Sequence, residues 1–148
     1  ESIDEARNKL NAVIENGAAL EAFKTFLASQ GGDPSVVDDP SKLPQAKYTF
    51  KLEAKTDGYV SEMVADEIGT AAMLLGAGRA TKESEIDLAV GLVLNKKVGD
   101  SVKQGESLVT IYSNFTDIEE VKDKLYKNIK IADEIVESPI LIYEEITD

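Results

Sequence analysis

A glycine-rich loop at residues 76–81, GAGRAT, is the segment of this sequence that most invites a chemical role. Glycines let backbone N–H groups approach an anion, and the Arg79 guanidinium can form a bidentate pair with a phosphate. The spacing fits neither phosphate-binding pattern, because Thr81 stands where a dinucleotide fingerprint has its third glycine and no Lys-Ser/Thr pair follows. We therefore interpret the loop as a structural turn in which Arg79 pairs with Glu83 or Glu85.

Clustered carboxylates are the next candidates, either as metal ligands or as acid–base pairs. The clusters are Glu119-Glu120, Glu144-Glu145 and the trio Glu83, Glu85 and Asp87. A calcium loop needs oxygen ligands at alternating positions around a central glycine and a closing Glu, and no window of the sequence fits. We expect these acids to form solvated faces, because acidic side chains are mostly exposed.

Lys55 is a candidate for covalent modification, because it precedes an Asp57-Gly58 turn. Residues 58–63 (GYVSEM) and 98–108 (VGDSVKQGESL) resemble the two halves of a biotinyl or lipoyl carrier domain, whose acceptor lysine sits at a hairpin tip. The segment after the second half, residues 112–115 (YSNF), has no lysine. A stand-alone carrier or interaction module is the alternative hypothesis, and a likeness of fold does not fix function.

Composition limits the classes of function. The chain has 148 residues, 43% of them hydrophobic and 30% charged, which indicates a soluble globular protein with one sizeable core. Its net charge of −12 and pI of 4.4 argue against a nucleic-acid partner, since the basic cluster of Lys96, Lys97 and Lys103 is small.

Two residue types that often supply catalytic and metal-binding groups are missing. The chain has no cysteine and no histidine, which excludes disulfides, thiol catalysis, cysteine-based zinc sites and a histidine general base. No apolar run approaches the roughly 20 residues of a membrane helix. The sequence opens inside a helical pattern without an initiator methionine, so we expect it to be a piece of a longer protein.

The first third of the sequence predicts two helices and a connector. Ser2 and Glu5 form a capping-box pattern that begins a helix, and Asn16-Gly17 separates it from a second helix that ends at Gly31-Gly32. Residues 33–47 contain three prolines in a polar stretch, which forbids a continuous helix and predicts a linker.

The rest of the sequence mixes strands and helices. Tyr48, Phe50 and Leu52 alternate with polar residues and predict a strand that begins near residue 48. Further strands are predicted over 59–64, 89–94 (buried), 98–111 (strand–turn–strand), 129–131 and 140–143. Helices are predicted over 68–75, capped by Asp66, and from a second capping box at residues 116–119 through about Tyr126. This mixed order predicts an α+β fold.

Nearly the whole chain resembles the C-terminal part of the pyrimidine-nucleoside and thymidine phosphorylases. Residues 17–32 (GAALEAFKTFLASQGG) resemble the helix before the C-terminal domain of that family, with its A-x₃-F-x₆-Q-G-G pattern. The densest likeness lies in residues 71–73 (AAM), 75–82 (LGAGRATK), 86–87 (ID), 89–91 (AVG) and 97–100 (KVGD).

The resemblance implies a parent enzyme that splits uridine or thymidine with inorganic phosphate into the free base and a pentose 1-phosphate. Such enzymes are cytoplasmic homodimers with the active site in a cleft between a small helical domain and a larger α/β domain. Cleft closure brings the two substrates together and excludes water. The partner of this chain would be the remainder of that enzyme.

The sequence departs from the complete family pattern at the active site. It lacks the Lys-x-Ser phosphate segment, the Ser-Arg-Lys group that holds the pyrimidine, and the active-site histidine. We therefore assign no catalytic, substrate-binding, cofactor or metal residue, and we expect nucleoside and phosphate to bind to segments outside this chain. Residues 1–32 are expected to be helices from the end of the central α/β domain, 33–47 a linker, and 48–148 a C-terminal mixed-sheet domain with a β-hammerhead or barrel-sandwich-like motif.

Overall fold

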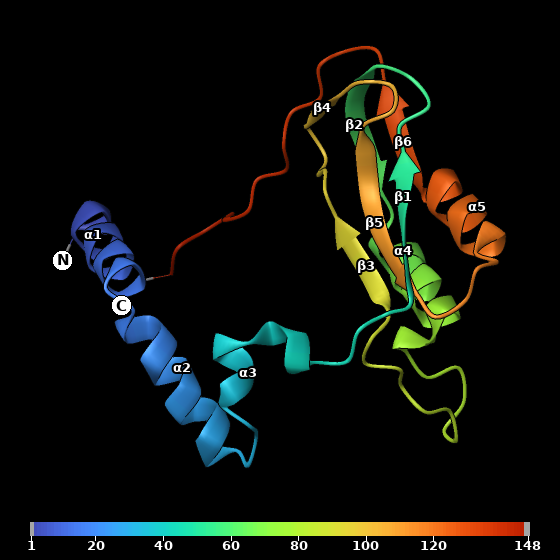
Figure 1. Ribbon diagram of the computed structural model, residues 1–148. Helices are drawn as coiled ribbons and strands as arrows, with labels where there is room; N and C mark the ends of the chain where they lie inside the picture. The colour runs from blue at the N-terminus through green and yellow to red at the C-terminus, as the bar shows by residue number, and fades with distance from the viewer. Residues whose placement is uncertain (1, 147–148) are drawn as a thin grey trace. The chain divides into compact units, whose positions relative to one another are not determined.

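The computed structural model describes residues 2–146 (Figure 1). The predicted domain boundaries at residues 1 and 148 therefore lie outside the described residues, as does residue 147. The chain divides into two compact units, Glu1–Pro44 and Gln45–Asp148. Helices occur in both units and every described strand belongs to the second. The predicted α+β class is therefore correct. None of the described helices is long and apolar enough to span a membrane.

The first unit begins with two consecutive helices, α1 (Ile3–Glu15) and α2 (Ala18–Ser29). The predicted capping box is present, because Ser2 Oγ accepts the Glu5 N–H at 3.2 Å and Glu5 Oε2 accepts the Ser2 N–H at 2.8 Å. Gly17 separates the helices at φ +79°, a left-handed conformation that glycine adopts at little cost. The break at Asn16-Gly17 is thus confirmed.

Neither of these helices buries a residue. Large apolar side chains are exposed along both: Ile3, Leu10, Ile14, Leu20, Phe23 and Phe26. Helices of this length draw most of their stability from the packing of an apolar face. The described part of the first unit therefore has helices without a core of its own.

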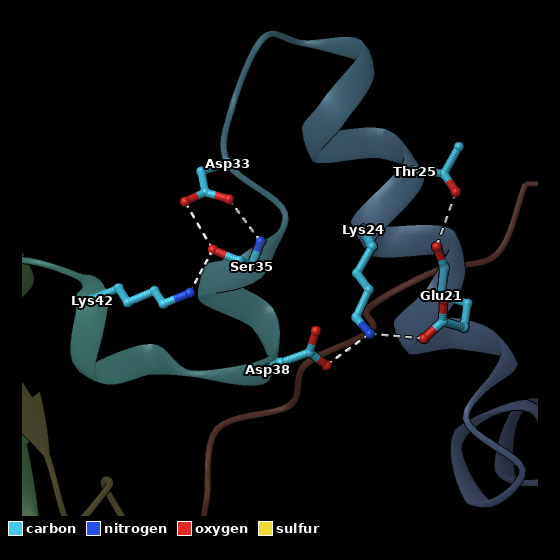
Figure 2. A network of polar contacts seen from close by, with 7 residues as sticks. All are labelled: Glu21, Lys24, Thr25, Asp33, Ser35, Asp38 and Lys42. Carbon is cyan, nitrogen blue, oxygen red and sulfur yellow. Dashed lines mark hydrogen bonds and ion pairs between the residues drawn. The ribbon is translucent and has the colours of Figure 1, made fainter.

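The segment predicted as a linker contains two short helical turns, α3 (Ser35–Asp38) and the 3₁₀ helix η1 (Pro40–Lys42). Figure 2 shows that the Lys24 ammonium of α2 bridges two carboxylates, Glu21 at 2.8 Å and Asp38 at 2.7 Å. Hydrogen bonds to these two acids, the one to Asp38 first, raise the pKa of Lys24. This ion pair fastens α3 to α2.

The second unit contains two three-stranded sheets with strand orders β1-β5-β3 and β4-β2-β6. The strands of the first are β1 (Tyr48–Glu53), β5 (Ser107–Ser113) and β3 (Gly91–Leu94). Those of the second are β4 (Ser101–Val102), β2 (Gly58–Met63) and β6 (Ile129–Ala132). All four pairings are antiparallel, so the prediction of a mixed sheet is wrong. Parallel pairs need a crossover that returns the chain in the same direction, and the paired strands here run in opposite directions.

The core of the second unit lies between these sheets and three helical segments. These are α4 (Ala65–Ala72), the π-helical turn η2 (Met73–Ala77) and α5 (Glu119–Asn128). Its fully buried apolar side chains are Leu52, Val60, Leu75, Leu108, Val109, Ile111 and Leu125. Both sheets, η2 and α5 contribute to this set, and Ala71 of α4 is also fully buried, which makes the unit one packed body.

Both helices of the second unit begin differently from their predicted caps. At α5 the predicted Thr116 cap is wrong, because the helix begins at Glu119 with Ile118 as its N-cap. Ile118 is only 3% exposed, and its burial places the start of the helix after the predicted box. Asp117 Oδ1 accepts the Glu119 N–H instead, at 3.3 Å.

At α4 the predicted cap, Asp66, lies in the first turn of the helix. The N-cap is Val64, whose N–H donates to the Asn128 carbonyl at 3.0 Å, so the helix follows β2 almost directly. The strand predicted as buried over 89–94 is β3, and Val93 in it is 50% exposed. It is a sheet edge rather than a central strand.

The strand predicted over 140–143 is absent. Residues 133–146 follow β6 without a described helix or strand, and Figure 1 shows them as an extended segment. Ile140, Leu141, Ile142 and Tyr143 are all exposed. Their consecutive apolar side chains require cover on both faces of a strand, and each sheet of this unit has an exposed outer face.

Candidate functional site

The loop of residues 76–81 is a turn closed by its own polar groups. Gly76, at φ +101°, ends the π-helical turn, and its carbonyl accepts the Asp87 N–H at 2.9 Å. Further along, the Thr81 N–H donates to Ser84 Oγ at 3.1 Å and the Ser84 N–H donates to the Thr81 carbonyl at 3.3 Å. The bond from the Thr81 N–H uses a donor that a phosphate-binding loop would present to its ligand. These contacts are those of a turn, in keeping with the structural interpretation of the loop.

Arg79 has no ion pair with Glu83 or Glu85, so that part of the prediction is wrong. Arg79 is exposed, and the ion pairs found within residues 2–146 use lysines elsewhere in the chain. The turn is already closed by Thr81 and Ser84, and an exposed pair would add little to its stability.

Asp87 is half-buried rather than solvated, which corrects its placement among the exposed acids. Its Oδ2 accepts from Asn114 Nδ2 at 2.7 Å and its Oδ1 accepts the Ala89 N–H at 3.0 Å. Asn114 Oδ1 in turn accepts the Lys47 N–H at 3.0 Å. We call this set the Asp87–Asn114 network. It joins the loop before β3 to the start of β1 and the end of β5.

The sequence held one signal of this network. An Asp whose side chain bonds the N–H two residues later is a common turn former, and Asp87 has that relation to Ala89. The bond to Asn114 spans 27 positions, and no local sequence pattern predicts it. The other clustered acids are exposed as predicted: Glu83, Glu85, Glu119, Glu120, Glu144 and Glu145.

Lys55 lies in the connection between β1 and β2, with its ammonium 3.8 Å from the centroid of the Tyr126 ring. The Tyr126 hydroxyl donates to the Glu53 carbonyl at 2.9 Å, which fixes the ring. A cation over an aromatic face is a stabilising contact. The arrangement gives Lys55 a structural partner on α5.

Two members of the small basic cluster, Lys96 and Lys103, line an open hollow of about 430 Å³ that also holds acids. Lys96 Nζ lies 3.1 Å from Glu106 Oε2 and donates to the Ser101 carbonyl at 2.9 Å. The Lys103 N–H, followed by the Lys96 ammonium, lowers the pKa of Glu106. The positive charge of Lys96 is therefore engaged inside the unit.

The acidic side chains do not form a metal centre in the described part of the chain. No group of three or more acidic side chains in it is placed to hold a metal ion. The predicted site residues are thus spread over separate structural contacts, and they do not converge on one pocket.

Comparison with known proteins then identifies the family. Residues 59–132 match the family described as Pyrimidine nucleoside phosphorylase C-terminal domain. The chain belongs to this family. The matched residues include the loop at 76–81 and Asp87, whereas α1, α2 and the segment after β6 lie outside the match.

Relatives of the phosphorylase family extend the match over almost the entire chain. It is 68% identical to the pyrimidine-nucleoside phosphorylase of Geobacillus stearothermophilus over 99% of its length. It is 62% identical to that of Bacillus subtilis (strain 168) and 56% identical to that of Staphylococcus aureus (strain COL), in both cases over 100% of its length. Each match covers 34% of the relative, so the chain spans about a third of the length of these curated relatives.

Proposed function

We propose that this chain is the C-terminal part of a pyrimidine-nucleoside phosphorylase, a pentosyltransferase. The parent reaction is the attack of inorganic phosphate on a pyrimidine nucleoside, which gives the free base and a pentose 1-phosphate. The observation that carries the proposal is the 68% identity over 99% of the chain to a protein of that name, together with the family match at residues 59–132.

Within that enzyme the chain has a structural role and holds no active-site residue. Its candidate groups are engaged in structural contacts, as Lys55 is with Tyr126 and Asp87 is with Asn114. Nucleoside and phosphate bind to the remainder of the enzyme, and this part needs no cofactor. A packed core such as that of the second unit is suited to move as a rigid body when an active-site cleft closes.

The proposed division of the chain has helices at 1–32 that end the central α/β domain, a linker at 33–47 and the C-terminal domain at 48–148. The boundary between the two compact units, after Pro44, supports it. The C-terminal domain contains a hammerhead or barrel-sandwich-like arrangement, in keeping with two small antiparallel sheets that share one core. The parent enzyme is a cytoplasmic homodimer in this proposal.

An assay of uridine phosphorolysis tests the function. The complete enzyme that contains this chain should release uracil in the presence of phosphate, and the chain alone should show no turnover. Clear turnover by the chain alone would contradict the assignment of the active site to the remainder. A complete enzyme that is inactive on every pyrimidine nucleoside would overturn the proposed reaction.

The carrier hypothesis makes a separate prediction about mass. A carrier domain would gain the mass of biotin or lipoate on a lysine, whereas a phosphorylase segment keeps its unmodified mass. Intact-mass spectrometry of the chain purified from its host distinguishes them. The contact between Lys55 and Tyr126 favours the unmodified form.

A further inference from the structure

The last described residues, 139–146, form a largely apolar tail in which every side chain is exposed. Residues 133–146 have no described helix or strand, and Figure 1 shows them as an extended segment. The large apolar side chains of the tail are exposed: Ile140 by 65%, Leu141 by 93%, Ile142 by 78%, Tyr143 by 86% and Ile146 by 87%. A contiguous exposed apolar segment of this kind marks a surface that binds something.

The order of the side chains indicates the kind of site. Residues 140–143 are apolar without interruption, so a strand formed by them would present apolar groups to both faces of its sheet. Such runs are typical of strands that are covered on both faces. The sheet β1-β5-β3 has an exposed outer face, where Val93 is 50% and Tyr112 is 37% exposed. That sheet therefore does not offer the required cover.

The start of the tail is fixed on the domain. Gly99 has φ +96°, and a Cβ placed on it would lie 2.9 Å from Ser138 N and 3.0 Å from Ser138 Cα. Ser138 and Pro139 then border an apolar hollow of about 550 Å³ together with Ile68 and Leu94. Leu141 also borders this hollow and is still 93% exposed, so the hollow does not bury it. The free part of the tail begins at Pro139.

The unpaired backbone and the negative charge of the tail indicate two further properties of the site that binds it. Among the described backbone hydrogen bonds, none uses an N–H or carbonyl of residues 139–146. Carboxylates flank the apolar run on both sides, and residues 133–148 contain no lysine or arginine: the acids are Asp133, Glu134, Glu137, Glu144, Glu145 and Asp148. A segment with these properties is complementary to a sheet that has both faces covered, an accessible strand edge and a basic rim.

The comparisons indicate where this site lies. The C-terminal domain match ends at residue 132, yet the relatives match over 99–100% of the chain, so the tail belongs to the enzyme without belonging to the matched domain. About two thirds of the relatives' length lies outside this chain. We infer that residues 139–146 bind as a strand to the part of the enzyme outside this chain, an inference that depends on the proposed function.

Hydrogen–deuterium exchange measured by mass spectrometry tests the inference on two samples, this chain alone and the complete enzyme that contains it. In the complete enzyme, amides of residues 140–146 should exchange roughly 100-fold more slowly than in the chain alone, as strand amides do when they become paired. The amides of Lys82 and Glu83, which lie in an exposed turn, serve as the internal control and should exchange rapidly in both samples.

Every other pattern overturns the inference. Rapid exchange of the tail in both samples would mean that it stays unbound. Protection in both samples would mean that the hollow beside Ile68 and Leu94 receives it. Protection that appears only at high protein concentration would mean that a second copy of the chain receives it.

Substitutions in the complete enzyme give a second readout. Leu141→Asp should restore rapid exchange of residues 140–146, and 0.5 M salt should speed their exchange several-fold because the basic rim is screened. Leu88→Asp is the matched control, since Leu88 is 77% exposed and lies outside the tail, and it should leave tail exchange unchanged. An enzyme that catalyses phosphorolysis with an unprotected tail would overturn this inference alone, whereas an inactive enzyme would overturn the proposed function.

Discussion

The Asp87–Asn114 network and a few glycines hold the second unit together at the level of single residues. Asp87 and Asn114 supply side-chain groups where backbone strands end and their ladder bonds stop. Gly58 contributes by having no side chain. A Cβ at this position would overlap with the Ala132 carbonyl oxygen and would lie 2.7 Å from Ile131 Cγ2. The pairing of β2 with β6 therefore depends on the absence of a side chain.

Replacing Gly58 by alanine should strongly destabilise the second unit. The substitution adds backbone strain at φ +147° to the overlap with β6, and we expect a loss of about 2–6 kcal/mol. Gly91→Ala is the matched control, because Gly91 has a similar φ of +157° and open space around its Cβ position; it should cost about 1–3 kcal/mol. Urea unfolding followed by circular dichroism measures both, and equal losses would contradict the steric explanation.

Glu106 should make the fold sensitive to acid. The Lys103 N–H and, second, the Lys96 ammonium hold the pKa of Glu106 below its usual value of 4.5. Since the folded pKa is the lower one, the stabilising contribution is complete above pH 4.5 and is lost as the pH falls through the folded pKa. An NMR titration of the carboxyl groups should show this depressed pKa.

The variant Lys96→Gln separates the two causes. It should raise the pKa of Glu106 only part of the way to 4.5, because the larger cause, the hydrogen bond from Lys103, is retained. A pKa that returns fully to 4.5 would show that the ammonium dominates. Lys97→Gln serves as the control, because no ion pair to Lys97 is found among the described residues.

At the level of elements, the first residues of the helices show how a local capping pattern competes with the burial of an apolar side chain. The capping box at Ser2 forms because no tertiary demand opposes it on the exposed helix α1. The same pattern at residues 116–119 fails because Ile118 is drawn into the core. The pattern is a local preference worth about 1 kcal/mol, and burial of an isoleucine side chain is worth about 1.5–3 kcal/mol.

Substitutions before α5 should follow the structure rather than the sequence pattern. Asp117→Ala removes the acceptor of the Glu119 N–H and should destabilise the second unit by about 0.5–2 kcal/mol. Thr116→Ala should change its stability by less than about 0.5 kcal/mol, because Thr116 is exposed and does not cap the helix. The midpoint of urea unfolding decides between them, and a larger loss for Thr116→Ala would restore the capping-box interpretation.

The sequence predicted helices and strands well where one face of the element is buried and the other is exposed to solvent. The strand from Tyr48 to Glu53 was predicted from its alternation, and Leu52 and Phe50 do face the core. Residues 140–143 were predicted as a strand because they are apolar, but a strand also needs a partner, which the described residues do not provide. At the candidate site, the glycines at 76 and 78 predicted a turn, while the bond between Asp87 and Asn114 depends on the folded sheet.

The distribution of buried residues differs sharply between the two units of the molecule. Every residue of the described core lies between Leu52 and Ile129, inside the second unit. The first unit has helices, an ion-pair network and no buried residue in α1 or α2. Stability measured on the chain should therefore report almost entirely on the second unit.

Removal of residues 1–44 should leave the unfolding of the second unit unchanged. We expect the free energy of unfolding of residues 45–148 to differ from that of the full chain by less than about 0.5 kcal/mol, since no buried side chain is removed. Near-ultraviolet circular dichroism of the tyrosines follows the transition, because all five tyrosines lie after residue 44. A shortened chain that unfolds without cooperativity would contradict this expectation.

The order of the strands in the two sheets also affects the rate of folding. None of the described strands pairs with the strand that directly precedes or follows it in the chain, since Tyr48 of β1 pairs with Ser113 of β5 and Tyr59 of β2 pairs with Ala132 of β6. The entropy cost of closing such long loops comes before the stabilisation from strand pairing. This order slows folding to about milliseconds to seconds. During synthesis, β1 and β2 are made before their partners β5 and β6. Until β5 and β6 are made, the growing chain contains β1 and β2 without these partners, and this is the interval in which a chaperone has most to protect.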